Sequence, residues 1–249
     1  MRKIADFEFR VQPLDVDFNG SVRLTQMIGY LLHTAGQNAE ENGFGINALH
    51  SQKKAWVASR LALEMYRYPK ADEIFQIETW IEDYGRVFTT RNFKITDISG
   101  LLIGAGSSIW CMLDITTRKA LDLGGTDYSG FATGITSLIE KPARIPSITC
   151  EPVSRHRVKY SDIDINLHAN SMKYIEWMVD LLPLGFFQNR YVRRIDINYV
   201  NEIYFGEKVD ICLSQNKENA CIFEMKRDTD IICRSSMQFD DCFDLTEIK

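Results

Sequence analysis

Residues 24–41 carry the clearest periodic pattern of the chain. Apolar residues recur there at the three-and-four spacing of a helix that is buried along one face. Glycines at positions 43 and 45 follow the run and end it. The apolar positions are Leu24, Met27, Ile28, Leu31, Leu32 and Ala35. We therefore predict a helix over about residues 24–41.

The next hundred residues are dominated by β-branched and aromatic residues. Turn sequences at residues 68–69, 83–85 and 97–100 divide this region into strands. One helix followed by several antiparallel strands is an α+β pattern, in which the sheet can wrap around the helix. The four predicted strands cover residues 56–65, 74–81, 86–96 and 101–113.

A proline-rich stretch separates this region from the rest of the chain. Three of the six prolines fall at positions 142, 146 and 152, which predicts a linker with a short helical piece near residues 135–139. A second helix is predicted over about residues 171–182, with Asn170 or Ser171 as its cap. We expect three parts, which are an N-terminal domain (1–128), a linker (129–152) and a C-terminal domain (153–249).

The order of elements after the linker repeats the order before it. A shift of 147 residues places Asp17 on Asp164, and a shift of 134 aligns the strands that follow. Matches that keep the same order indicate a duplicated unit. The copies differ at one informative position, where Ser21 of the first copy stands opposite His168 of the second.

Composition narrows the classes of function. Hydrophobic residues make up 45% and charged residues 25%, as in an ordinary globular protein. The net charge of -5 argues against broad binding to nucleic acid or a membrane surface. The six cysteines form no CxxC pair, and the first residues lack an export signal. We therefore expect reduced thiols, a cytoplasmic location and no metal site.

The polar stretch at residues 162–170 holds the best candidates for chemistry. Polar and apolar residues alternate there, so Asp164, Asn166 and His168 are expected on one side of an extended segment. The helix that follows has N–H groups able to stabilise an oxyanion. Turn formation and helix capping are the alternative role for the acids and amides. A calcium loop is excluded, because Leu167 stands where an EF-hand needs glycine.

The segment from Asp164 to Trp177, together with residues 56–60 and 107–110, resembles the acyl-acyl carrier protein thioesterases of plant plastids and bacteria. The resemblance covers nearly the whole chain. It implies a tandem (double) hotdog fold, in which each antiparallel sheet wraps around a central helix and the first domain shapes the substrate tunnel. The implied reaction is hydrolysis of the thioester of fatty acyl-acyl carrier protein, which releases free fatty acid and ends fatty acid synthesis.

The resemblance also defines the partners. It implies an acyl carrier protein that carries a phosphopantetheine-linked acyl chain. We expect no cofactor, nucleic acid or membrane as a further partner. The sequence leaves the oligomeric state open, a homodimer included. Because the carrier protein is acidic, we expect a local basic surface. Its candidate residues are Arg155, Arg157, Lys159, Arg190, Arg193 and Arg194.

The family further places a glutamate after the active-site helix, where this sequence has Glu202. A cysteine usually follows in the family, but this chain has Ile203, so a thiol mechanism does not carry over. We expect Glu202 to act as general base or to orient water, with Asp164 sharing that role. His168 would polarise the thioester or protonate the leaving thiolate. Asn166 would orient His168 or the water.

Three other functions use the same features. An acyl-CoA thioesterase would run the same chemistry on a different carrier, and a hotdog dehydratase would also use a histidine and a carboxylate. A non-catalytic acyl-binding protein would need neither group. The difference between Ser21 and His168 favours an enzyme, since a scaffold needs no extra polar set in one copy.

Overall fold

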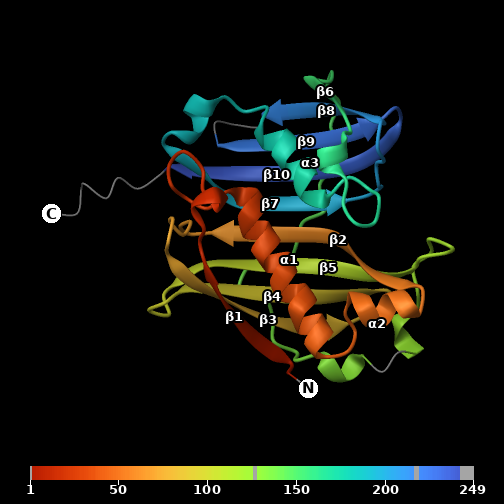
Figure 1. Cartoon of the computed structure of the whole chain (residues 1–249). Helices are drawn as coiled ribbons and strands as arrows, with labels where there is room; N and C mark the ends of the chain where they lie inside the picture. Colours follow the sequence, from red (N-terminus) through yellow and green to blue (C-terminus); the bar gives the residue numbers. More distant parts are fainter. Residues whose placement is uncertain (1, 126–127, 216–218, 242–249) are drawn as a thin grey trace. The chain divides into compact units, whose positions relative to one another are not determined.

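The computed structural model describes residues 2–125, 128–215 and 219–241. The chain forms two compact units, Met1–Arg144 and Ile145–Lys249, whose boundary lies within the predicted linker. Both units contain an antiparallel sheet and a helix (Figure 1), so the predicted α+β class is confirmed. No helix among the described residues is long and apolar enough to span a membrane.

The N-terminal unit has five strands in the antiparallel order β1-β3-β4-β5-β2. The predicted helix over residues 24–41 and the four predicted strands are confirmed, and β1 is an additional edge strand. The elements are β1 (Ile4–Arg10), α1 (Leu24–Glu41), α2 (Ile46–Ser51), β2 (Lys54–Met65), β3 (Ile74–Tyr84), β4 (Phe88–Asp97) and β5 (Leu102–Asp114).

The C-terminal unit repeats this plan in the order β7-β10-β9-β8-β6, again antiparallel. Its elements are β6 (Ser154–Arg157), α3 (Ser171–Val179), β7 (Arg190–Tyr199), β8 (Lys208–Gln215), β9 (Ala220–Arg227) and β10 (Asp230–Asp241). Asn170 caps α3 by accepting a hydrogen bond from the Met172 N–H (2.9 Å), as one of the two predicted caps. The helix ends at Val179, earlier than predicted. Short 3₁₀ helices lie at Pro13–Asp15, Leu123–Gly125, Ser129–Phe131, Tyr160–Asp162 and Leu184–Phe187.

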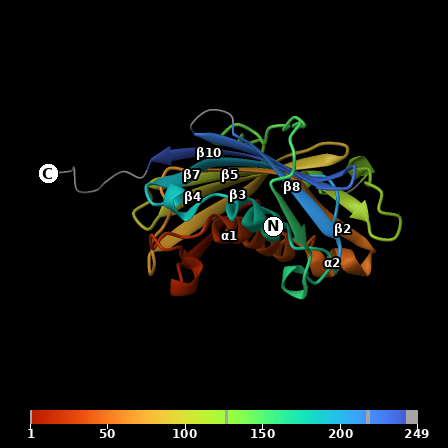
Figure 2. The ribbon, with the colours of Figure 1, turned by 90° about the horizontal axis from the view of Figure 1, so that it is seen from above.

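The core of the N-terminal unit lies between α1 and the face of the sheet that it covers (Figure 2). Phe93 and Ile95 alternate along β4, point to that face and are fully buried. A Cβ atom on Gly106 of β5 would lie only 3.2 Å from the side chains of Leu31 and Phe93. Glycine at this position therefore lets the helix pack closely on the sheet.

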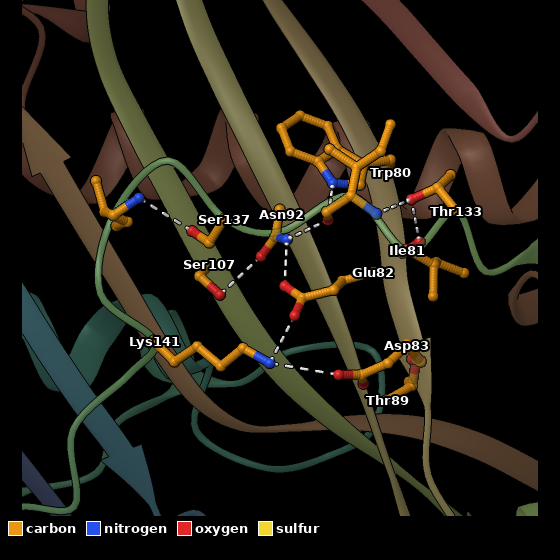
Figure 3. Close-up of polar contacts among 12 residues, drawn as sticks. Trp80, Ile81, Glu82, Asp83, Thr89, Asn92, Ser107, Thr133, Ser137 and Lys141 are labelled. Carbon is orange, nitrogen blue, oxygen red and sulfur yellow. Dashed lines mark hydrogen bonds and ion pairs between the residues drawn. The ribbon is translucent and has the colours of Figure 1, made fainter.

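The chain after β5 covers the other face of the same sheet (Figure 3). The Thr133 N–H donates to the Ile81 carbonyl (2.9 Å), and the Trp80 indole N–H donates to the Ile135 carbonyl (2.8 Å). Ile139 packs in a small apolar cluster with Ala62 and Ala105. The predicted helix near residues 135–139 is wrong, because these residues form no helix: the Ile135 carbonyl accepts from β3, and the Ile139 N–H donates to the Ser137 hydroxyl (3.2 Å) instead of to a backbone carbonyl.

A buried polar network joins this segment to the sheet (Figure 3). Asn92 is fully buried, donates to Glu82 Oε2 (2.8 Å) and accepts from the Ser107 hydroxyl (2.9 Å). Lys141 completes the network through Glu82 Oε1 (2.7 Å) and Asp83 Oδ2 (3.3 Å). Each buried polar group of this network thus has a partner, which avoids the desolvation penalty of an unpaired one.

Replacing Asn92 by Leu is expected to lower the free energy of unfolding by about 3 kcal/mol, because Glu82 and Ser107 would each lose a buried partner. Urea unfolding of the full chain measures the change. Asp83→Asn is the control, since Asp83 is half exposed and its ion pair contributes at most about 0.5 kcal/mol. Equal losses for the two variants would contradict the role of Asn92.

Candidate active site

Residues 163–169 form a tight turn in front of α3. The Asp164 N–H donates to the His168 carbonyl (2.9 Å), and the Leu167 N–H donates to the Asp164 carbonyl (3.0 Å). Leu167 adopts a left-handed backbone with φ of 66°. The predicted extended segment is therefore wrong, because the chain reverses direction between Asp164 and His168.

The N-terminal unit contains the same turn at the positions given by the 147-residue shift. The Asp17 N–H donates to the Ser21 carbonyl (2.8 Å), and the Gly20 N–H donates to the Asp17 carbonyl (3.0 Å). Gly20 has φ of 68°, nearly the value of Leu167. The duplication inferred from sequence is thus visible in individual backbone hydrogen bonds.

The turn brings His168 to Glu202. An isolated antiparallel bridge joins His168 to Tyr204, and the Ala169 N–H donates to the Ile203 carbonyl (2.8 Å). His168 Nε2 then lies 3.3 Å from Glu202 Oε2, with the side chains 18% and 30% exposed. A histidine and a carboxylate at hydrogen-bonding distance, open in part to solvent, form a pair suited to proton transfer.

Two tyrosines complete the surroundings of this pair. The Tyr204 hydroxyl donates to Glu202 Oε2 (3.2 Å), and its ring meets the His168 ring edge-on at 5.1 Å. Burial raises the pKa of Tyr174, and the negative charges of Glu202 and Asp164 raise it further. Both predicted carboxylates therefore lie close enough to Tyr174 to act on the same phenol.

Asn166 and the N-terminus of α3 make fewer interactions in the candidate site than the sequence predicts. Asn166 is exposed, and its N–H donates to Asp164 Oδ1 (2.8 Å), whereas its side chain has no hydrogen bond within the described residues. The Met172 and Lys173 N–H groups both donate to Asn170. These two helix N–H groups are occupied, so they are not free to stabilise an oxyanion.

The thiols do not form part of the site. Cys233 is fully buried, and burial raises the pKa of its thiol, so it is not an available nucleophile. Burial, together with the hydrogen bond and charge interaction with the Cys150 side chain, raises the pKa of Cys212 to about 12. Cys242 lies outside the described residues. Within the residues described, no cluster of three or more His, Cys, Asp or Glu could hold a metal.

Comparison with known proteins identifies the family of this chain. The model of the acyl-ACP thioesterase N-terminal domain matches residues 3–125, and the model of the C-terminal domain matches residues 147–241. The chain belongs to the acyl-ACP thioesterase family. Its double hotdog fold, expected from the resemblance, is confirmed.

Solved and curated family members agree with this assignment. The crystal structure of an acyl-ACP thioesterase from Bacteroides thetaiotaomicron is 38% identical, with a TM-score of 0.90 over 96% of this chain and 98% of that chain. The chloroplastic oleoyl-acyl carrier protein thioesterase of Coriandrum sativum is 27% identical over 82% of this chain, and thioesterase 2 of Arabidopsis thaliana is 24% identical over 88%. The chain spans 60% and 65% of the lengths of these two thioesterases.

Sequence reasoning missed Tyr204, although the repeat contained a signal for it. The 134-residue shift places Lys70 opposite Tyr204, and an antiparallel bridge joins Lys70 to Ser21 in the first copy. The Lys70 ammonium donates to the Ser21 hydroxyl at 2.8 Å. The side chain two residues after the Glu202 position therefore faces the turn in both copies of the repeated unit.

Leu167→Gly is expected to raise the free energy of unfolding by about 0.5–1 kcal/mol, because glycine adopts a left-handed backbone without the strain of a Cβ atom. Urea unfolding measures the gain. The matched change Gly20→Ala introduces that strain into the first copy, so it is expected to lower stability by about 1 kcal/mol. A loss of stability in Leu167→Gly would contradict a strained turn.

Proposed function

We propose that the chain hydrolyses the thioester of fatty acyl-acyl carrier protein and releases free fatty acid. The proposal rests on the contact between His168 Nε2 and Glu202 Oε2, which are 3.3 Å apart. The first copy has Ser21 and Tyr68 at the two equivalent positions. Family membership and the names of the relatives support the substrate class. A single catalytic set in the C-terminal unit follows from the asymmetry of the copies.

The reaction needs a water molecule, a base and a route for one proton. Glu202 takes a proton from water as the water oxygen bonds to the thioester carbon. The carbon–sulfur bond then breaks, and the proton moves from Glu202 through His168 to the leaving thiolate. A carboxylic acid and the pantetheine thiol of the carrier are the products. The Tyr204 hydroxyl, which donates to Glu202, orients the carboxylate.

The two carboxylates differ in their surroundings. Glu202 contacts the His168 ring directly, whereas Asp164 Oδ1 accepts the backbone N–H of Asn166. We therefore assign the base to Glu202, and we give Asp164 the role of shaping the turn and adding negative charge near the water. Asn166 remains our candidate for orienting that water, from an exposed position on the turn.

His168→Ala and Glu202→Gln are each expected to lower kcat at least about 100-fold, since positioned acid–base groups contribute 10²–10⁴. The measurement is release of free thiol from an acyl-acyl carrier protein. Ser21→Ala, the counterpart of the His168 change in the first copy, is the control and should keep wild-type kcat. Full activity in either site variant would remove that residue from the mechanism.

Docking of the acidic carrier protein requires basic groups that lack internal partners. Among the predicted arginines, Arg190 pairs with Asp241, Arg193 with Asp240, Arg194 with Asp196 and Arg155 with Asp210. Their charges are therefore offset within the unit. Arg157 and Lys159 are exposed and form no ion pair with other described residues, so we propose that they contact the carrier protein.

We also propose that the protein is located in the cytoplasm.

The double variant Arg157→Glu with Lys159→Glu is expected to raise KM for an acyl-acyl carrier protein about tenfold or more, because two attractive charges become repulsive. KM for a short soluble thioester should stay unchanged. Arg190→Glu, at a position already paired with Asp241, serves as the control. Equal changes in KM for both substrates would rule out docking at this surface.

A further inference from the structure

A second histidine–carboxylate pair lies outside the candidate active site, in the C-terminal unit. Nε2 of His156, on β6, is 3.1 Å from Oδ2 of Asp162, in the 3₁₀ helix before the turn. The Asp162 side chain is 6% exposed, and its Oδ2 also accepts the Lys159 N–H (2.8 Å). Because an ionised carboxylate only accepts hydrogen bonds, the hydrogen of the contact with His156 lies on Nε2.

Two contacts fix the position of His156. Its backbone lies in β6, opposite Val209 of β8 in the antiparallel sheet. Its ring stacks on the Trp177 indole of α3, with the ring centroids 4.1 Å apart and an angle of 27° between the planes. The imidazole therefore donates to Asp162 from a position that both the sheet and α3 define.

Asp162 forms the base of the turn that carries His168. The Asp162 carbonyl accepts the Asn170 N–H (2.7 Å). An isolated antiparallel bridge then joins the neighbouring residues Ile163 and Ala169. A displacement of Asp162 therefore disturbs the backbone contacts on which the position of His168 depends.

The N-terminal unit contains the same aspartate with a different donor. The 147-residue shift places Asp15 on Asp162, and the Asp15 carbonyl accepts the Arg23 N–H (2.9 Å) at the base of the first turn. The Tyr30 hydroxyl of α1 donates to Asp15 Oδ2 (2.6 Å). The counterpart of Tyr30 is Trp177, which has no hydroxyl group.

The donor thus lies on the helix in the first copy and on the strand in the second. The counterpart of His156 in β1 is Phe9, whose side chain has no polar atom. Both side chains that could supply the donor differ between the copies, whereas the aspartate and its hydrogen bond are retained. Since a buried carboxylate without a donor is costly, Asp162 depends on His156 in the unit that carries His168.

We propose that His156 is a positioning residue for the hydrolysis. By donating to Asp162, it keeps the base of the turn in place and holds His168 at hydrogen-bonding distance from Glu202. The inference rests on the proposed function and adds a residue that acts through Asp162 instead of on the reacting atoms. A role in stability alone would lower the free energy of unfolding and leave kcat of the folded protein unchanged.

The kinetics of His156→Phe with a short soluble thioester test this role. The variant copies Phe9 of the first unit and removes the donor to Asp162. We expect kcat to fall at least about tenfold through lost alignment, and KM to change less than about twofold, since the lost contact is not with the substrate. Adding Trp177→Tyr supplies the hydroxyl found in the first copy, so kcat should return to within about threefold of wild type.

The matched control is Tyr30→Phe, which removes the donor to Asp15 in the N-terminal unit. It should keep wild-type kcat, because the turn of that unit carries Ser21 in the place of His168. All rates are compared at a temperature at which thermal unfolding shows every variant to be folded, which separates kcat from stability.

Hydrogen exchange of the backbone amides at residues 163–169 follows the turn independently of activity. Exchange should be faster in His156→Phe and return to the wild-type rate when Trp177→Tyr is added. If wild type hydrolyses no thioester, the proposed function fails, and the exchange rates still decide whether His156 holds the turn.

Wild-type kcat in His156→Phe would overturn the proposal, as would an equal loss of kcat in Tyr30→Phe. A double variant with Trp177→Tyr that stays as slow as His156→Phe would overturn it as well. If His156→Phe does not fold, His156→Gln decides the question, because its amide N–H can donate in the place of Nε2. That variant should keep kcat within about threefold of wild type, and a loss of about tenfold would count against the role.

Discussion

The site depends on a backbone clamp between the turn before α3 and the segment after β7. The Ala169 N–H donates to the Ile203 carbonyl, and the bridge between His168 and Tyr204 extends the contact by one residue. Residues 168 and 202 are far apart in sequence, and this pairing brings their side chains to 3.3 Å of each other. Fixing both partners in advance lowers the entropic cost of assembling the reaction.

The same clamp exists in the first unit without the same chemistry. The Val22 N–H donates to the Pro69 carbonyl (2.9 Å), at positions that the two repeat shifts map onto Ala169 and Ile203. Ser21 and Lys70 occupy the places of His168 and Tyr204. The backbone is thus a scaffold that both copies share, and the two copies differ in the side chains placed on it.

Local patterns in the sequence predicted local structure well and long-range structure poorly. The periodicity of α1 gave its limits, because its buried stripe is uninterrupted. The edge strand β1 was missed although charged and apolar residues alternate along it, which is the pattern of a strand with one exposed face. The turn at Leu167 was missed because leucine carries no turn signal, whereas glycine does at the equivalent Gly20. Similarly, the acids that offset Arg190 and Arg193 lie on a neighbouring strand.

The residues of the candidate site could be predicted from the sequence, but their arrangement in space could not. His168 was identified from the polar stretch and the difference between the copies and Glu202 from the resemblance, while their contact is a product of the fold. A double-mutant cycle on kcat/KM for an acyl-acyl carrier protein tests the central claim that the two residues act as one unit. The account predicts that the double variant of His168→Ala and Glu202→Gln is no slower than the slower single variant. Losses that multiply in full would contradict it.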